Sequence, residues 1–136
     1  MCHYLSYAVI GYLATCSALA TSADMTADCP ARVPENSFAP NKPPAGWTGS
    51  VRGPSVLAEV GMMAAPPDEL QYLVPNKEGK EFQVYEFQAG DRQRWLWCGY
   101  SGGLQLSRRL DDKATKCRIS ERRRAKELLS AEVKCQ

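Results

Sequence analysis

The sequence predicts a mainly β fold: an antiparallel sheet of five or six strands, strongly bent or closed into a small barrel, with one short helix and two disulfides. Three observations predict this fold class. Short runs of alternating apolar and polar residues are separated by Gly-, Pro- and Asp-containing turns. Four cysteines follow a separate N-terminal segment. The length of 136 residues suits one domain.

The N-terminal segment, residues 1–20, is predicted to be a signal peptide. No Lys, Arg, Asp or Glu precedes Asp24, and residues 8–20 form an apolar run shorter than the roughly 20 residues that span a bilayer. Small side chains allow cleavage after Ala20 or Ala23. A buried N-terminal helix is one alternative, because the start of the segment lacks Lys and Arg. A lipoprotein signal ending at Cys16 is another, because Leu13-Ala14-Thr15-Cys16 resembles a lipobox. We expect a periplasmic or secreted protein that meets the membrane only through this transient signal.

The cysteines predict two disulfides in the exported chain. Cys2 and Cys16 leave with the signal, and the four that remain are Cys29, Cys98, Cys117 and Cys135. An even number in a small exported domain indicates a disulfide framework. Of the three pairings we favour Cys98–Cys117, across neighbouring strands, with Cys29–Cys135, which ties the chain ends together. A four-cysteine zinc site is the alternative, although no Cys-x-x-Cys spacing supports it.

The remaining pattern divides into a Pro-rich arm, residues 21–46, and a β domain, residues 47–136. We expect the arm to be extended or looped, to lie over the domain and to be anchored by Cys29. The expected strands are 47–51, 56–63, 82–87, 94–100, 104–110 and 115–120. Residues 66–75 predict a short helix that packs Leu70, Leu73 and Val74 on the sheet. The C-terminal tail fits a helix or a strand equally well.

The residue types available exclude several chemistries. The single histidine, His3, lies in the predicted signal, so Ser-His-Asp and Cys-His catalysis and His-based zinc sites are excluded from the mature chain. The pairs Asp68/Glu69 and Asp111/Asp112 are interpreted as a helix start and a turn. We therefore expect no catalytic residue, metal or cofactor.

Two surface features are candidates for binding a partner. Trp95 and Trp97 share one face of a strand, which is either covered on both sides or an aromatic platform for a sugar, peptide or protein. The second feature is a basic cluster, either a solvated face with ion pairs or a docking site for an anionic partner such as an acidic protein or envelope polymer. Its members are Arg118, Arg122, Arg123, Arg124 and Lys126, with Arg108 and Arg109 nearby in sequence. A net charge of +2 is too small to indicate nucleic-acid binding.

Several segments, in this order, resemble a family of small exported bacterial proteins of unknown function, the "STY" family. They are Cys29-Pro30, Pro44–Trp47, Pro67–Leu70, Leu73–Pro75, Trp97–Tyr100, Leu106–Leu110, Cys117 and Cys135. The resemblance implies a periplasmic, mainly β domain with four cysteines and a strand at 131–135, and it implies no activity. This chain departs from the family pattern in its uncharged N-terminus and its Arg-rich stretch at 121–126.

The favoured hypothesis is a non-enzymatic periplasmic binding or inhibitory protein, such as an inhibitor of a lysozyme or amidase or an immunity protein against a cell-wall-targeting toxin. It rests on size, compartment and the missing catalytic residues. The alternatives are a carboxylate-dependent hydrolase of envelope polymers, using Asp68 or Asp111, and a structural envelope protein.

Overall fold

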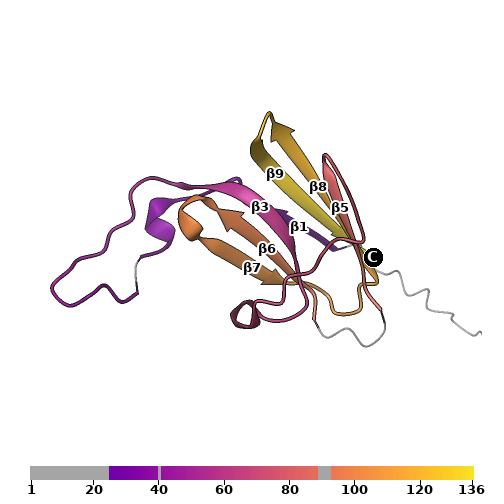
Figure 1. Ribbon diagram of the computed structural model, residues 1–136, viewed down its shortest axis with the longest axis horizontal. Coiled ribbons are helices and arrows are strands. Elements are labelled where there is room, and N and C mark those ends of the chain that lie inside the picture. Colours follow the sequence, from indigo (N-terminus) through magenta and orange to yellow (C-terminus); the bar gives the residue numbers. More distant parts are fainter. Residues whose placement is uncertain (1–24, 40, 89–92) are drawn as a thin grey trace, which may run out of the picture.

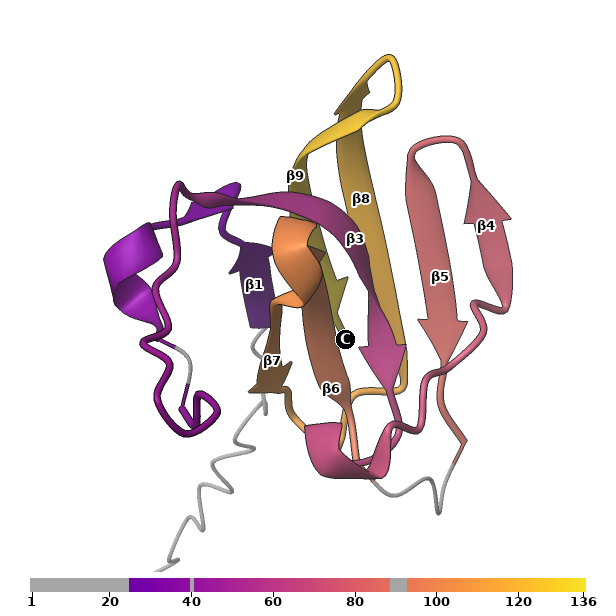
Figure 2. The same cartoon turned by 60° about the vertical axis from the view of Figure 1, so that its left-hand side comes forward.

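The protein is built from two antiparallel β-sheets that pack face to face, as the computed structural model shows (Figures 1 and 2). The structure describes residues 25–39, 41–88 and 93–136. The predicted signal peptide, both cleavage sites and His3 lie outside the described residues. The mainly antiparallel β class with two disulfides is confirmed. The predicted single sheet is corrected to two sheets, because strands expected to lie side by side are divided between two layers.

The first sheet has five strands in the order β1-β9-β8-β5-β4, and the second has four in the order β2-β3-β6-β7. The strands of the first sheet are β1 (Met25–Cys29), β4 (Lys77–Gly79), β5 (Phe82–Glu86), β8 (Lys116–Arg124) and β9 (Glu127–Cys135). Those of the second sheet are β2 (Arg32–Val33), β3 (Ser55–Met63), β6 (Trp95–Tyr100) and β7 (Gln105–Arg109). Three short 3-10 turns complete the described elements: η1 (Glu35–Ser37), η2 (Pro67–Glu69) and η3 (Ser101–Gly103).

The core lies between the two sheets and follows the alternation of the strands. In β8 and β9 the buried residues Ile119 and Val133 alternate with exposed polar ones. In β3 and β6 the buried Met62 and Leu96 supply the opposite layer. Burying a side chain of this size contributes about 1.5–3 kcal/mol, so this single apolar layer is a main source of stability.

The disulfides are Cys29–Cys98 and Cys117–Cys135, so the predicted pairing was wrong. That pairing assumed that Cys98 and Cys117 lie on neighbouring strands, but β6 and β8 belong to different sheets. Cys117 and Cys135 are instead directly opposite on β8 and β9. Cys29 ends β1 in the first sheet and bonds Cys98 of β6 in the second, with their Cα atoms 5.8 Å apart.

The helix predicted at 66–75 is also corrected. Only the 3-10 turn η2 forms, and Leu70 ends it in the left-handed conformation with a φ of 51°. The chain then runs back extended beside β3, with Tyr72 bridged to Met63 and the Leu73 N–H donating to Met62 O at 2.9 Å. Leu73 packs against the core as expected, whereas Leu70 is 62% exposed and Val74 86% exposed.

The remaining expected elements have mixed outcomes. The strand predicted at 47–51 does not form: Trp47 is 74% exposed and closes a turn through its N–H bond to Pro44 O. The other five predicted strands are confirmed, with shifted ends. The ambiguous tail is strand β9, as the family resemblance implied for 131–135.

Residues 25–29 and 32–33 of the predicted arm add β1 and β2 to the sheets, and its loop projects from the body in Figure 1. Within the described ranges, no helix is long and apolar enough to cross a membrane.

The two disulfides should contribute unequally to stability. The chain-entropy model assigns about 4 kcal/mol to Cys29–Cys98, which spans 69 residues, and about 3 kcal/mol to Cys117–Cys135, which spans 18. We therefore expect Cys29→Ala/Cys98→Ala to lower the free energy of unfolding more than Cys117→Ala/Cys135→Ala does, as measured by urea denaturation without reductant. A larger loss of unfolding free energy in Cys117→Ala/Cys135→Ala would contradict the expectation that the inter-sheet bond contributes more to stability.

Candidate partner-binding surfaces

The β8–β9 hairpin extends beyond the sheet that contains it. Strand β1 pairs with β9 only over Ala131–Cys135, and β5 pairs with β8 only over Lys116–Ser120. Residues 122–130, hereafter the basic ribbon, pair only with each other among the strands of the described chain. Figure 2 shows this end of the hairpin rising clear of the other strands.

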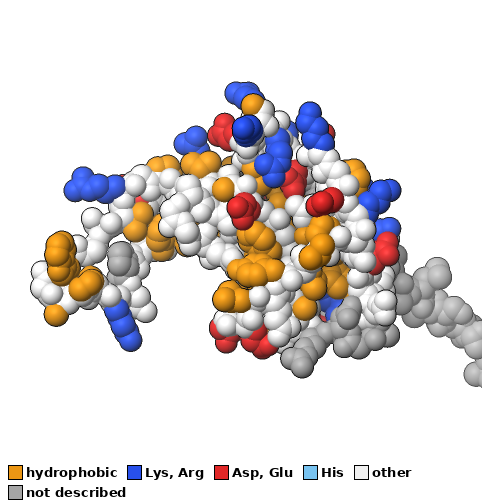
Figure 3. Space-filling view, in the orientation of Figure 1, with side chains coloured by type: hydrophobic (Ala, Val, Ile, Leu, Met, Phe, Trp, Pro, Cys, Tyr) orange, Lys and Arg blue, Asp and Glu red, His pale blue; other side chains and the backbone are white. Residues whose placement is uncertain are grey.

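The basic ribbon is strongly cationic. It contains four basic residues, Arg122, Arg123, Arg124 and Lys126, and one acidic residue, Glu127. All five are exposed. Lys and Arg side chains gather over this end of the molecule in the space-filling view (Figure 3). A local net charge of +3, which follows from four positive residues and one negative, exceeds the +2 of the whole chain.

A buried polar chain holds the base of the basic ribbon. Glu121, only 9% exposed, accepts hydrogen bonds from Gln83 Nε2 at 2.7 Å and from Arg123 Nε at 2.7 Å. Gln83 Oε1 in turn accepts the Tyr85 hydroxyl at 2.5 Å. Burial, with a smaller contribution from the nearby Glu121 carboxylate, raises the pKa of Tyr85 to about 12. Tyr85 therefore remains a neutral donor, and Arg123 neutralises the buried carboxylate.

The predicted basic cluster is consequently divided among several environments. Arg118 lies outside the ribbon, with its guanidinium 4.4 Å from the centre of the Phe82 ring. Arg109, on β7 of the second sheet, forms an ion pair with Asp112, and its hydrogen bond lowers the pKa of that carboxyl group. In the described chain, no ion pair engages Arg122, Arg124 or Lys126. These three cations remain available to a partner.

The two tryptophans occupy the outer face of the second sheet, while Leu96, Cys98 and Tyr100 are buried on its inner face, as predicted. The Trp97 indole lies against Gly61, where a Cβ atom would come within 2.6 Å of Trp97 Nε1. The Tyr72 ring packs edge-on against the same indole, with 5.3 Å between the two ring centroids. Trp95 Nε1 donates to Gln93 Oε1 at 2.6 Å. Both rings are half-buried and held by neighbours, so whether they form a binding platform stays a prediction.

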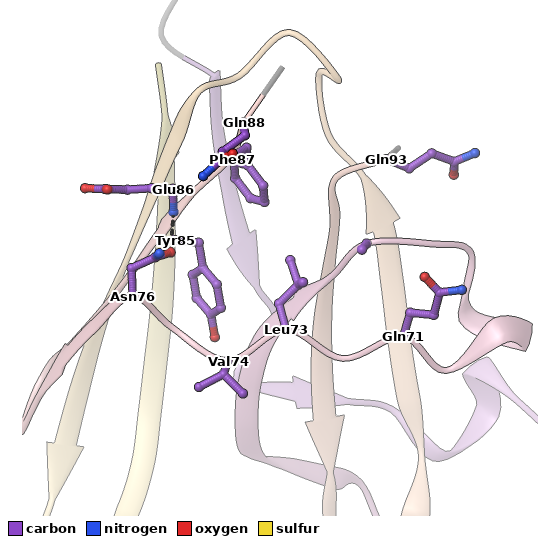
Figure 4. Close-up of a pocket in the computed structure, with 10 residues that line it drawn as sticks. Gln71, Leu73, Val74, Asn76, Tyr85, Glu86, Phe87, Gln88 and Gln93 are labelled. Carbon is purple, nitrogen blue, oxygen red and sulfur yellow. Dashed lines mark hydrogen bonds between the residues drawn. The ribbon is translucent and has the colours of Figure 1, made fainter. Parts of the chain in front are cut away.

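A cavity of about 460 Å³ lies where the two sheets diverge (Figure 4). Tyr85, Leu73 and Val74 line it together with side-chain amides from Gln71, Asn76, Gln88 and Gln93. Glu86 contributes its backbone, whose N–H donates to Asn76 Oδ1 at 2.7 Å, while its carboxylate points away in Figure 4. None of the sequence-predicted site residues lines this cavity.

The carboxylate pairs occupy turns. Asp68 and Glu69 are exposed in η2. Asp111 accepts the Lys113 N–H at 2.9 Å, and Asp112 pairs with Arg109. No group of three or more His, Cys, Asp or Glu that could hold a metal ion occurs within residues 25–39, 41–88 and 93–136.

The fold defines a small two-sheet β protein with two disulfides, and its described residues offer a basic surface and an aromatic surface to a partner. Residues 52–136 match the family model described as "Type VI secretion system Tli immunity protein". The match covers β3 through β9, and the chain belongs to this family. The predicted inhibitor or immunity class is therefore confirmed. Comparisons with curated proteins and with solved structures returned no match. The "STY" resemblance stays a prediction.

Proximity in sequence groups these arginines, but it does not show that the β8–β9 hairpin extends beyond its neighbouring strands. A signal for this was present. The apolar alternation of β8 ends at Ile119 and resumes at Leu128, with a polar, mostly charged run between them. Such a run within paired strands indicates a hairpin end without an apolar layer to pack against.

Neighbouring arginines should behave differently when truncated. Arg123→Ala removes the cation that neutralises the buried Glu121, and leaving a buried charge less compensated costs on the order of 1–3 kcal/mol. Arg122→Ala removes an exposed cation and should change the free energy of unfolding by less than about 0.5 kcal/mol. Urea denaturation of the two variants checks this, and equal effects would show that the Glu121–Arg123 contact has no stabilising role.

Proposed function

We propose that this chain is a non-enzymatic immunity protein of the periplasm that binds a type VI effector toxin and blocks its action. The observation that carries the proposal is the family match over residues 52–136, which includes β3 through β9 and both surfaces described above. Immunity proteins act by binding a partner protein, so the relevant property of this fold is a surface rather than a catalytic centre.

Two further features support the periplasmic part of the proposal. The Cys29–Cys98 and Cys117–Cys135 bonds persist in an oxidising compartment and are rare in a reducing cytoplasm. Residues 1–20 have the apolar run and small-residue cleavage sites of an export signal. The "STY" resemblance, which we retain as a proposal, points to the same compartment.

Rigidity supports inhibition by surface occlusion. The inter-sheet disulfide and the shared core fix the two sheets relative to each other. A partner surface held in its bound shape loses less conformational entropy on association, which favours tight binding. The carboxylate pairs are engaged in turns, and no observation favours the hydrolase alternative.

Protection of living cells tests this function. A bacterium producing the cognate type VI effector, identified by its gene beside this one, is made to export the effector to its periplasm. We expect the full chain to restore growth, because it reaches the effector with its disulfides formed. The same chain without residues 1–23 should not protect, because it stays in a reducing compartment.

Two controls make the result interpretable. Immunoblots should show equal amounts of both chains, and an inactive effector should leave growth normal in either case. Growth arrest despite exported, disulfide-bonded protein would contradict the immunity function. Equal protection by the version that lacks residues 1–23 would contradict the periplasmic site of action.

A further inference from the structure

The basic ribbon has the shape of an inserting element. Strand residues rise about 3.3 Å each, so Glu121–Arg124 carry β8 about 13 Å past its last pairing with β5. Only two strands make up this segment, and in the described chain neither outer edge pairs with a further strand. The Glu121 N–H donates to Glu81 O at 2.8 Å, and beyond it the backbone donors and acceptors along both edges are open to a partner.

The free charges on the ribbon define the chemistry of that partner. Arg122, Arg124 and Lys126 are exposed and lack ion pairs in the described structure, whereas Arg123 is engaged by Glu121. Burying three such cations in an interface requires carboxylates opposite them, since an unpaired buried charge is strongly unfavourable. Guanidinium groups also match carboxylates through paired hydrogen bonds.

The ribbon is anchored at its base, which makes it a preformed element. Leu128 is only 2% exposed and fixes β9 to the core. Glu121 links β8 to Gln83 and thereby to Tyr85 on β5. A projecting strand pair with a fixed base can dock without first folding, which reduces the entropy lost on binding.

The other candidate surface is less available. On the outer face of the second sheet, Trp97 packs on Gly61 and against Tyr72, and Tyr72 is itself held by a 2.9 Å hydrogen bond to Gln105. The contacts of Trp97 and Tyr72 therefore stabilise the protein itself and do not depend on a bound partner. Arg122, Arg124 and Lys126 have no such internal role, so their clustering at one projecting end needs a different explanation.

We propose that the basic ribbon is the effector-docking element of this protein and that it inserts into an acidic cleft of the effector. This inference rests on the proposed immunity function and adds the interface and its chemistry. The cations Arg122, Arg124 and Lys126 pair with carboxylates of the cleft, and the ribbon blocks access to it. Arg123 supports the ribbon from its base through Glu121.

A charge-reversal triple variant, Arg122→Glu/Arg124→Glu/Lys126→Glu, tests the proposal. The matched control is Lys77→Glu/Lys80→Glu/Lys113→Glu, which makes the same change in net charge at exposed positions outside the ribbon. Both leave Arg123 and Glu121 in place. Binding of the purified effector is measured by calorimetry at two salt concentrations, and urea denaturation together with a non-reducing peptide map confirms that each variant is folded.

We expect the ribbon variant to bind the effector at least about tenfold more weakly, because attraction becomes repulsion at three positions. It should also lose most of the salt dependence of wild-type binding. The control variant should bind as the wild type does. Unchanged binding by the ribbon variant, or equal losses in both variants, would overturn the proposal.

Two further results separate the remaining explanations. If the wild-type protein neither binds the effector nor protects cells, the proposed function fails. If it does both and the ribbon variant protects equally well, only the docking inference fails. Vesicles of phosphatidylglycerol provide the membrane comparison, and ribbon-dependent binding to them with unchanged effector affinity would assign the ribbon to a lipid surface instead.

Discussion

The covalent bond between Cys29 and Cys98 joins the end of β1 to the middle of β6, and the arrangement of the molecule depends on it. Each sheet buries one face, and the apolar layer between them is only one side chain deep from each sheet. Small domains with such a core have a small free energy of unfolding. The disulfide restricts the unfolded chain and holds the two sheets together, so the outer surfaces keep a fixed geometry relative to each other. A protein that works by presenting a surface needs this rigidity.

A second set of contacts explains why one hairpin can extend beyond the body of the protein. Strands β8 and β9 are fixed at one end by the Cys117–Cys135 bond and along their middle by Ile119 and Val133 in the core. Beyond Glu121 the ribbon still places Leu128 in the core, and the buried carboxylate with its partners Gln83 and Arg123 closes that end of the core. The ribbon past this point carries charge that contributes nothing to packing. The β8–β9 pair therefore has two different ends. The end with the Cys117–Cys135 bond stabilises the fold, and the cationic end is available for the proposed binding.

Much of the secondary structure was predictable from local pattern, whereas the arrangement of strands in space was not. Alternation of apolar and polar residues located β3, β5, β6, β7 and the first part of β8. In β6 and the first part of β8 every second residue is buried, whereas Leu106 of β7 is exposed. The disulfide pairing could not be predicted in this way, since it depends on which sheet each strand joins. The helix at 66–75 failed because its apolar spacing suited two structures, and bonds to β3 decided between them. The facing of Trp95 and Trp97 followed from alternation alone. The environment of Arg118 depended on Phe82, which is distant in sequence, whereas Arg123 pairs with Glu121 two residues before it.

Hydrogen exchange of the free and effector-bound protein, followed by mass spectrometry, tests the central claim most directly. In the free protein the amides of residues 122–130 should exchange faster than those of β3 and β6, because this end of the hairpin is exposed and neither of its outer edges pairs with another strand of the described chain. In the complex we expect the largest added protection on the ribbon, where both edges and the free cations meet the effector. Protection concentrated on β6 and β7 around Trp97, with exchange in the ribbon unchanged, would contradict it.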